Sequence, residues 1–143
     1  VAIGMALADR KRRVYCLISD AELQEGTTWE CALFAAHHGL DNLVVIVDYN
    51  KFQACGVTNK ILNLEPLLQK WQIFNWVPIG DDGHDLMKTE WALRISPQRG
   101  HPMIIICHTI KGKGIDFMEN NYHWHYKNLD RETYEKALLQ LSN

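Results

Sequence analysis

Two polar side chains follow strand-like segments at positions where they could bind a metal ion. Asp20 comes after the apolar run 14–18, and Asn50 comes shortly after the apolar run 43–47. Because the carboxyl ends of parallel strands meet at one edge of a sheet, where α/β proteins bind ligands, we expect both side chains at that edge. A carboxylate and an amide oxygen suit Mg²⁺ or Ca²⁺, which complete their shells with phosphate oxygens and water. The sequence therefore predicts a site for a hard cation. The types of ligand do not distinguish Mg²⁺ from Ca²⁺.

The elements that must position these residues alternate along the chain, which predicts an α/β fold with a parallel sheet flanked by helices. Short apolar runs bounded by turn residues predict strands at Val14–Ile18, Leu43–Val47, Trp76–Ile79 and Met103–Cys107. Capping residues and helix-forming stretches predict helices at Val1–Lys11, from Thr27 or Thr28 to His38, from Glu65 to Phe74, from the cap Asp85 to Ile95, and at Arg131–Leu141. Segment 48–63 is expected to be irregular and functional. Residues 1–143 are expected to form one domain.

Composition and charge narrow the class of protein. The 143 residues are 47% hydrophobic and 22% charged, with a formal net charge of −2 at pH 7, which is typical of a globular domain with a sizeable core. No basic face is evident, so a nucleic-acid partner lacks electrostatic support. The apolar runs are too short to span a bilayer, so no membrane partner is expected.

Cysteine usage and the start of the chain give two further expectations. Cys16, Cys31, Cys55 and Cys107 lack metal-type pairing, and most of them lie in apolar contexts. This pattern indicates buried thiols in a reducing cytoplasm. The chain starts inside a helix-like stretch and without a methionine, so we expect an N-terminally truncated domain.

Several separated motifs occur in the order found in one enzyme family. They are Ser-Asp-Ala-Glu-Leu-Gln-Glu-Gly at 19–26, Trp-Glu at 29–30, Leu-Asp-Asn-Leu at 40–43, Val-Asp-Tyr-Asn at 47–50, Asp-Gly-His-Asp at 82–85, Thr-Ile-Lys-Gly-Lys-Gly at 109–114 and Trp-His at 124–125. Together they resemble the thiamine-diphosphate motif and flanking segments of transketolases, over essentially the whole chain. The type that the chain resembles most is the N-terminal subunit of a split transketolase.

The resemblance implies a site for thiamine diphosphate and magnesium. Asp20, the Asn50 side chain and the backbone carbonyl of Phe52 would bind Mg²⁺, which bridges the diphosphate, so Asn50 would serve both metal and cofactor. The N–H of Ala21 would meet a phosphate oxygen, and Ala54 would lie against the cofactor. A divalent ion and backbone N–H groups are what a bound diphosphate requires.

The resemblance also implies an activity and a partner. Transketolases transfer a two-carbon ketol unit from a ketose phosphate to an aldose acceptor. Lys111 and His125 are similar to residues that reach the cofactor or the sugar, and Glu25 matches a glutamate at the interface between paired active sites. His125 and Glu25 are therefore the candidate catalytic residues. Because the glutamate that activates the cofactor belongs to a separate pyrimidine-binding domain, we expect a C-terminal partner subunit, an oligomer, and no activity from this chain by itself.

The chain departs from the family pattern at the first and last motifs. The first motif usually reads Gly-Asp-Gly, whereas Ser19 and Ala21 flank the aspartate here. If the backbone at residue 21 needs φ > 0, alanine is disfavoured there by about 1–2 kcal/mol, and its methyl group also intrudes where a phosphate approaches. Tyr126 replaces the glycine that commonly follows the Trp-His pair, which affects the expected substrate pocket.

These departures leave two alternative functions open. One is a related thiamine-diphosphate enzyme with another donor and acceptor, for example an acyl transfer to a nucleotide sugar. The other is a degenerate subunit that keeps the fold but does not bind the cofactor. Single features also have purely structural explanations: Asp20 could begin a turn, Asn50 could cap a strand, and Gly83-His84-Asp85 is most simply a turn and a helix cap. His123 and His125 lack a third metal ligand.

Overall fold

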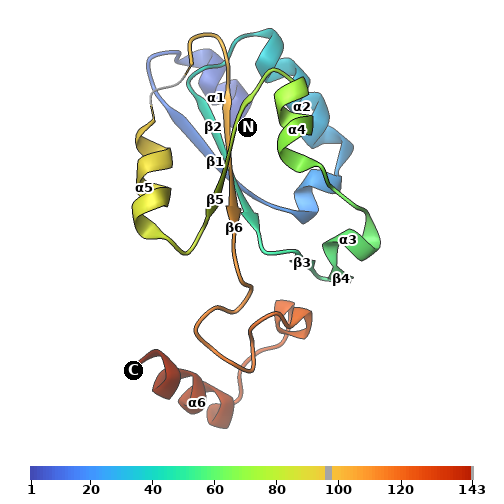
Figure 1. Ribbon diagram of the computed structural model, residues 1–143, viewed down its shortest axis with the longest axis vertical. Coiled ribbons are helices and arrows are strands. Elements are labelled where there is room, and N and C mark those ends of the chain that lie inside the picture. The colour runs from blue at the N-terminus through green and yellow to red at the C-terminus, as the bar shows by residue number, and fades with distance from the viewer. Residues whose placement is uncertain (96–97, 143) are drawn as a thin grey trace.

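The computed structural model describes residues 1–95 and 98–142 as a parallel sheet with helices on both faces, followed by a C-terminal lobe (Figure 1). The strand order is β1-β2-β6-β5, and all of these strand pairs are parallel. The strands are β1 Val14–Ser19, β2 Leu43–Tyr49, β5 Val77–Asp82 and β6 Met103–His108. The predicted α/β fold and parallel sheet are thus confirmed.

The register of the sheet brings the ends of β1 and β2 to one edge. Ser19, the last residue of β1, pairs with Asp48 of β2, and Tyr49 at the end of β2 pairs with His108 of β6. The central strands β2 and β6 are almost continuously apolar because helices cover them on both faces. The residues that follow β1 and β2 therefore emerge side by side at the carboxyl edge.

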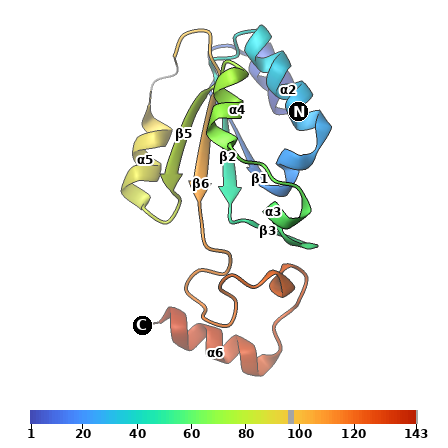
Figure 2. The ribbon, with the colours of Figure 1, turned by 45° about the vertical axis from the view of Figure 1, so that its right-hand side comes forward.

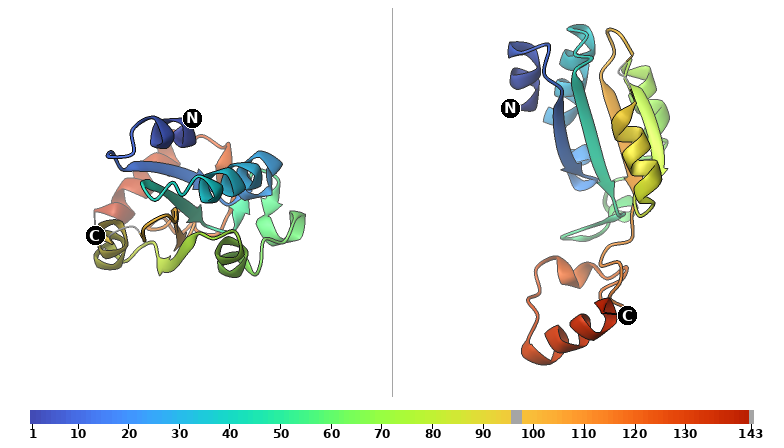
Figure 3. Two further views of the ribbon diagram at one scale, coloured as in Figure 1. Left: turned by 90° about the horizontal axis from the view of Figure 1, so that it is seen from above. Right: turned by 90° about the vertical axis from the view of Figure 1, so that its left-hand side faces the viewer.

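The helices divide between the two faces of the sheet (Figures 2 and 3). Buried residues of α1, α2 and α4 share one core with Val45, Val47 and Ile104 of the central strands. α5 packs on the opposite face, over Val44 and Ile105. The bounds of these helices are α1 Ala2–Ala8, α2 Gly26–His37, α4 Leu67–Ile73 and α5 Leu86–Arg94.

Tryptophan side chains fill the space between α2, α4 and the sheet. The Trp71 ring lies 5.2 Å from the Trp29 ring and 4.8 Å from the Trp76 ring, measured between centroids. The Trp76 indole N–H donates to the carbonyl of Ala32 at 2.9 Å, so its polar atom is satisfied inside the core. Trp91 on α5 is 62% exposed and takes no part in this packing.

Two predicted helix starts or ends are wrong. α1 ends at Ala8 rather than Lys11, because the Asp9 carboxylate accepts the N–H of Lys11 at 3.0 Å and closes a turn. The basic cluster 10–13 therefore lies outside the helix. α2 begins at Gly26, and Thr28 does not cap it but donates its hydroxyl to the carbonyl of Glu22 at 2.6 Å.

The segment 48–63 is more regular than predicted. β2 continues to Tyr49, and a short antiparallel hairpin follows, formed by β3 (Phe52–Gln53) and β4 (Gly56–Val57). The helix α3, Thr58–Ile61, comes directly after it. The hairpin lies just beyond the carboxyl edge of the sheet, so this segment is placed where a ligand would bind (Figure 1).

The C-terminal lobe extends past the carboxyl edge of the sheet (Figures 1 and 2). It contains the 3-10 helix η2 (Tyr122–His125) and the helix α6 (Arg131–Leu141), whose predicted bounds are confirmed. The Asp130 carboxylate caps α6 by accepting the N–H of Thr133 at 2.8 Å. Asp85 caps α5 in the same way, as predicted.

Two findings bear on the expected environment of the protein. Within residues 1–95 and 98–142, no helix is both long and apolar enough to cross a membrane. The thiols are free, but Cys31 and Cys55 are exposed and Cys16 is half-buried, whereas Cys107 is buried. The expectation that most of the thiols are buried is therefore wrong.

Candidate functional site

Asp20 is the buried centre of the carboxyl edge. It follows β1 directly and its side chain is 0% exposed. Its Oδ2 accepts a hydrogen bond from the hydroxyl of Thr58 at 3.0 Å, whereas its Oδ1 has no hydrogen-bond partner within the described part of the chain. Burial is the main cause that raises the pKa of Asp20, against the opposing effects of Thr58 and the backbone of Lys51 and Ala21. An ionised carboxylate with one buried, unpaired oxygen is destabilising unless it takes up a proton or a cation binds to it.

Asn50 directly follows β2, whose carboxyl end lies beside that of β1. Its Oδ1 accepts the N–H of Phe52 at 2.9 Å, and its Nδ2 donates to Asp48 Oδ2 at 2.9 Å. The amide is therefore held in one orientation, and its oxygen keeps a second lone pair. The backbone of Lys51, the next residue, lies close enough to Asp20 to lower the pKa of that carboxyl, so the ends of β1 and β2 meet. The pairing of Asp20 with Asn50 at one ion stays a prediction.

The set of oxygen atoms at this edge fits a hard cation. It offers one carboxylate, one side-chain amide and the backbone carbonyl of the half-buried Phe52. No cluster of three or more His, Cys, Asp or Glu side chains that could hold a metal occurs among the described residues. A site built from these three kinds of oxygen is suited to an ion that also binds phosphate and water, and not to a transition metal.

Ala21 has a backbone conformation that alanine adopts without strain. It begins the 3-10 helix η1, Ala21–Gln24, and its φ is not positive. The penalty of about 1–2 kcal/mol considered for a left-handed conformation therefore does not apply. The N–H of Ser19 donates to the Glu22 carboxylate at 2.8 Å, which is half of a capping box and fixes the start of this turn.

Gln24 ties this turn to the hairpin, a role that the sequence did not indicate. Its side-chain N–H groups donate to the carbonyls of Leu62 at 2.8 Å and Thr58 at 3.3 Å. Its Oε1 accepts from the side chain of Gln53 at 3.1 Å. Ala54, the expected cofactor contact, is half-buried in the turn between β3 and β4. The hydrogen bonds of Gln24 therefore hold the segment on which it lies.

Lys111 lies in the turn that follows β6 and is half-buried. The preceding N–H, that of Ile110, donates to Nε2 of His84 at 2.8 Å, so this ring nitrogen is the unprotonated one. The segment around Gly83 can lie this close to the loop after β6 because Gly83 has no side chain. A Cβ there would lie 2.6 Å from a side-chain atom of Thr109. The segment 82–85, expected to form only a turn and a cap, therefore also positions the loop that carries Lys111.

His125 and Glu25, the candidate catalytic residues, are both exposed. His125 lies in η2, which packs beside β3, and its ring contacts the Tyr126 ring at 4.8 Å between centroids. Tyr126 is 78% exposed and does not fill a pocket in this chain. Glu25 lies at the N-terminus of α2. The carboxyl edge therefore has a buried end at Asp20 and an open outer end at His125 and Glu25.

A neighbouring polar cluster was not predicted. Tyr49 at the end of β2 donates its hydroxyl to Glu65 Oε1 at 2.6 Å, and the Tyr49 ring contacts that of His108 at 5.3 Å. The hydrogen bond from Tyr49 is the main cause that lowers the pKa of Glu65. Burial is the main cause that raises the pKa of Tyr49. These residues line a small cavity of about 60 Å³ beside the candidate site.

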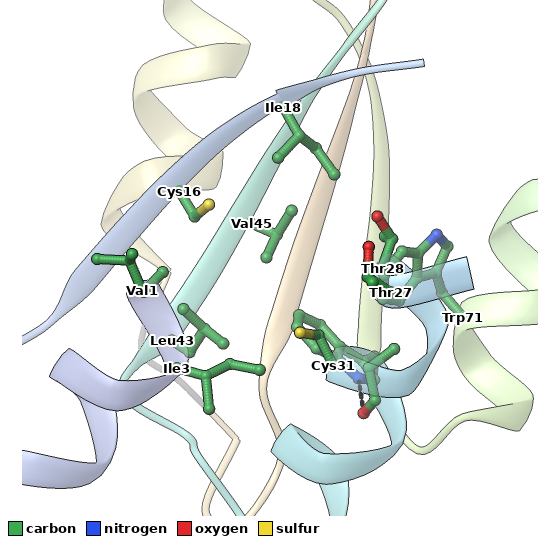
Figure 4. A pocket seen from close by; sticks show the side chains of 13 residues that line it. Val1, Ile3, Cys16, Ile18, Thr27, Thr28, Cys31, Leu43, Val45 and Trp71 are labelled. Atoms are coloured by element: carbon green, nitrogen blue, oxygen red, sulfur yellow. Dashed lines mark hydrogen bonds between the residues drawn. The ribbon is translucent and has the colours of Figure 1, made fainter. Parts of the chain in front are cut away.

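A larger apolar cavity of about 200 Å³ lies away from this edge, between α1, β1 and α2 (Figure 4). Cys16, Ile18, Cys31 and Trp71 are among its lining residues, and none of the predicted site residues lines it. The predicted site residues therefore belong to the carboxyl edge of the sheet, where α/β proteins bind ligands, and not to this cavity.

Residues 4–141 match the profile of the family described as "Transketolase, thiamine diphosphate binding domain". The chain belongs to the transketolase family. The resemblance drawn from the motifs is therefore confirmed, and the matched domain is the one that binds thiamine diphosphate.

Curated relatives of this transketolase-family chain include proteins that are named as transketolase subunits. It is 40% identical to one subunit of the apulose-4-phosphate transketolase of Actinobacillus succinogenes, over 100% of this chain and 53% of that protein. It is 39% identical to "6-deoxy-6-sulfo-D-fructose transketolase subunit SqwG" of a Clostridium species, over 98% of this chain and 53% of that protein. The chain thus spans about half the length of these relatives.

Solved transketolase structures have the same fold. The crystal structure of transketolase from Campylobacter jejuni superimposes with a TM-score of 0.91 at 28% identity, over 99% of this chain and 24% of that chain. A transketolase variant from Pichia stipitis gives a TM-score of 0.85 at 20% identity over 95% of this chain and 22% of that chain, which shows the fold alone. Together they agree with the parallel sheet described above.

Proposed function

We propose that this chain forms the part of a two-subunit transketolase that binds thiamine diphosphate and Mg²⁺. The observation that carries the proposal is the buried Asp20 carboxylate, whose Oδ1 has no hydrogen-bond partner in the described residues. A bound cation would satisfy that oxygen and offset the cost of its desolvation. Family membership supplies the cofactor, and the oxygen ligands favour a hard divalent ion.

The proposed ligands come from the two strand ends. Asp20 Oδ1, the Asn50 amide oxygen and the Phe52 carbonyl would bind Mg²⁺, which in turn neutralises the diphosphate. The N–H of Ala21 would donate to a phosphate oxygen, and Ala54 would lie against the cofactor. Bound thiamine diphosphate supplies the carbanion chemistry that breaks and forms a carbon–carbon bond next to a carbonyl. This chain anchors and orients that cofactor.

The substrate end is proposed to lie above the carboxyl edge. Lys111, on the loop braced by His84, would offer a cation to an anionic sugar, and His125 in η2 would contact the sugar or the cofactor. The relatives are named for a phosphorylated and a sulfonated ketose, which share an anionic group and a ketose unit. We therefore propose transfer of a two-carbon ketol unit from an anionic ketose to an aldose acceptor.

A partner subunit is part of the proposal. Two relatives, 40% and 34% identical to this chain, are each named as one subunit of an apulose-4-phosphate transketolase. His125 and Glu25 are exposed here, which supports an active site that a C-terminal, pyrimidine-binding subunit completes. We expect an oligomer located in the cytoplasm and no activity from this chain alone.

The alternative of a degenerate subunit loses part of its support. It rested partly on backbone strain at Ala21, and that residue begins η1 with an ordinary backbone conformation. The alternative of another donor and acceptor keeps its support from Tyr126, whose exposed ring replaces the usual glycine. A donor screen with the assembled enzyme separates it from ketol transfer.

The proposal is tested by calorimetric titration of thiamine diphosphate, with and without MgCl₂, into the full protein purified with its partner subunit. We expect Mg²⁺-dependent binding that Asp20→Ala abolishes. Asp9→Ala, which removes an exposed carboxylate from the turn after α1, is the matched control and should bind normally. Binding that persists without Asp20, or no binding by the folded wild-type complex, would overturn the proposal.

A further inference from the structure

The carboxylate of Asp48, near the carboxyl end of β2, accepts hydrogen bonds from two different parts of the candidate site. Its Oδ2 accepts from Nδ2 of Asn50 at 2.9 Å. Its Oδ1 accepts from the hydroxyl of Thr109, which is 61 residues away and follows β6, the strand that leads into the C-terminal lobe (Figure 1). One side chain thus holds a proposed metal ligand and the start of the loop that carries Lys111.

On the Asn50 side, the contact decides which atom of the amide is available to an ion. Asp48 holds Nδ2, and the N–H of Phe52 holds Oδ1 at 2.9 Å. A rotated amide would lose both bonds, because its oxygen would face the carboxylate and its NH₂ group would face the N–H of Phe52. The contact with Asp48 therefore keeps the oxygen, and not the nitrogen, as the possible ligand atom.

On the Thr109 side, the contact is one of three that hold the first residues of the loop after β6. The N–H of Thr109 donates to the carbonyl of Tyr49 at 3.3 Å, and the N–H of Ile110 donates to His84 at 2.8 Å. The backbone bond to Tyr49 is longer than the about 2.9–3.0 Å typical of N–H···O bonds. The loop therefore depends on its side-chain contacts, among them the bond from Thr109 to Asp48.

We infer that Asp48 is a positioning residue that couples the proposed metal site to the loop that carries Lys111. The inference rests on the proposed function, because it takes Asn50 as a metal ligand and Lys111 as a group that faces the sugar. The two parts of the site share one carboxylate. Removing that carboxylate should loosen both parts, whereas removing the Thr109 hydroxyl should loosen only the loop.

The experiment measures the two parts separately in the full protein purified with its partner subunit. Calorimetry gives the dissociation constant of thiamine diphosphate in the presence of MgCl₂, which reports on the metal site. Amide hydrogen exchange of residues 110–114, followed by mass spectrometry without cofactor, reports on the loop. The variants are Asp48→Ala, Thr109→Val and their combination, and Asp48→Asn and Thr109→Ser test rescue.

Asp41→Ala is the matched control for a general loss of stability. The Asp41 carboxylate also joins separate segments, because it accepts the N–H of Gly100 at 3.0 Å and forms an ion pair with Arg10 at 3.3 Å. It precedes β2 and so lies at the opposite edge of the sheet. This variant should leave both measurements within about twofold of wild type, because it shares no partner with Asp48.

We expect Asp48→Ala to weaken cofactor binding about tenfold and to speed exchange of the loop about tenfold, as for one hydrogen bond lost in each part. Thr109→Val should speed exchange equally and keep the cofactor dissociation constant within about twofold. The double variant should exchange no faster than Asp48→Ala, since both changes remove the same hydrogen bond. Asp48→Asn and Thr109→Ser should stay within about threefold of wild type, because both keep hydrogen-bonding groups at these positions.

Three results would overturn the inference: additive effects of the two changes on loop exchange, unchanged loop exchange in Asp48→Ala, or unchanged cofactor affinity in that variant. If the wild-type complex does not bind the cofactor, the proposed function fails and the coupling with it. The exchange data then still decide whether Asp48 holds the loop. Asp48→Ser, whose shorter side chain cannot reach both partners, replaces the alanine variant if that variant does not fold.

Discussion

The proposed metal end of the candidate site, at Asp20, and the C-terminal lobe differ in how much of their arrangement this chain fixes by itself. At the metal end, Asp20 and Thr58 are fully buried and their neighbours are held by side-chain and backbone hydrogen bonds. In the lobe, His125 and Tyr126 are exposed, and the lobe extends away from the sheet (Figure 1). The two regions lie on either side of the same candidate site.

The difference suggests that the two regions serve separate steps, cofactor binding at the Asp20 end and turnover in the C-terminal lobe. A metal and diphosphate site needs fixed oxygen atoms, and a buried network provides them before the ligand arrives. The groups proposed to contact the sugar, such as His125, are exposed in this chain, so we expect their final arrangement to depend on what covers them. Changes at the metal end should therefore alter cofactor binding, and changes in the lobe should alter turnover.

The largest effect is expected from Asp20→Asn, which removes the negative charge of the proposed metal ligand. Loss of the charged ligand should weaken Mg²⁺-dependent cofactor binding at least about 100-fold, or about 2.7 kcal/mol. The metal-free protein should become more stable by about 1 kcal/mol, because a buried ionised group with an unpaired oxygen is removed. Urea unfolding without metal, beside calorimetry with it, measures both. A variant that is less stable and still binds the cofactor would contradict the comparison.

A smaller effect, confined to the lobe, is expected from Gly112→Ala. Gly112 has φ +74°, and a Cβ there would lie 2.6 Å from the Met118 backbone. We expect the loop after Lys111 to shift and kcat/KM to fall by about tenfold, while cofactor affinity stays within about twofold. Gly4→Ala is the control, because a Cβ there meets nothing within 4 Å. Equal losses of binding and turnover would show that the regions are not separable.

Tyr49→Phe tests whether the edge beside the metal end is stabilised by its hydrogen bonds. The bond from Tyr49 lowers the pKa of Glu65, so its contribution is present above the ordinary glutamate pKa and is lost as pH falls through the lowered value. We expect Tyr49→Phe to lose about 0.5–1 kcal/mol at neutral pH, since Glu65 is exposed and partly screened.

The pH dependence of that loss provides the control. At a pH below the lowered pKa, where Glu65 is protonated in both proteins, the free energies of unfolding should converge. Tyr134→Phe, on the exposed face of α6, should show no such pH dependence. A loss from Tyr49→Phe that stays constant with pH would contradict the role of the Glu65 charge.

The smallest effect is expected from Ala21→Gly, which restores the usual family residue. Because Ala21 begins η1 without strain, glycine should destabilise the protein by about 0.5–1 kcal/mol through the entropy of the unfolded chain. Cofactor affinity should change less than about threefold. Calorimetry with Ser19→Gly as a second variant checks this. A large gain in affinity would revive the degenerate-subunit alternative.

The sequence predicted the strands better than the turns. The buried strands were recognisable because central parallel strands are continuously apolar, and α5 and α6 were recognisable from their aspartate caps. The end of α1 and the start of α2 were wrong, because Asp9 closes a turn and Thr28 bonds to Glu22 instead of capping. Competing side-chain bonds of this kind leave no distinctive local pattern.

The roles of Thr58, Gln24 and His84 could not be predicted from spacing. Each acts through a contact between segments that are 26 to 38 residues apart. The sequence does not mark these pairs, because the partner of Gln24 is a backbone carbonyl, that of His84 is a backbone N–H, and that of Thr58 is a carboxylate singled out for another role. The backbone conformation at Ala21 could not be predicted either, because alanine is compatible with several types of turn.

By itself, the sequence determined the fold class, the family and the edge at which Asp20 and Asn50 emerge, because strand periodicity and motif order are local properties of the chain. Only the tertiary structure decided that Asp20 is buried with one oxygen held and the other unpaired, that Ala21 is unstrained, and that His125 remains exposed. Burial and hydrogen bonding depend on which distant segments meet, and packing sets that after the strands are paired.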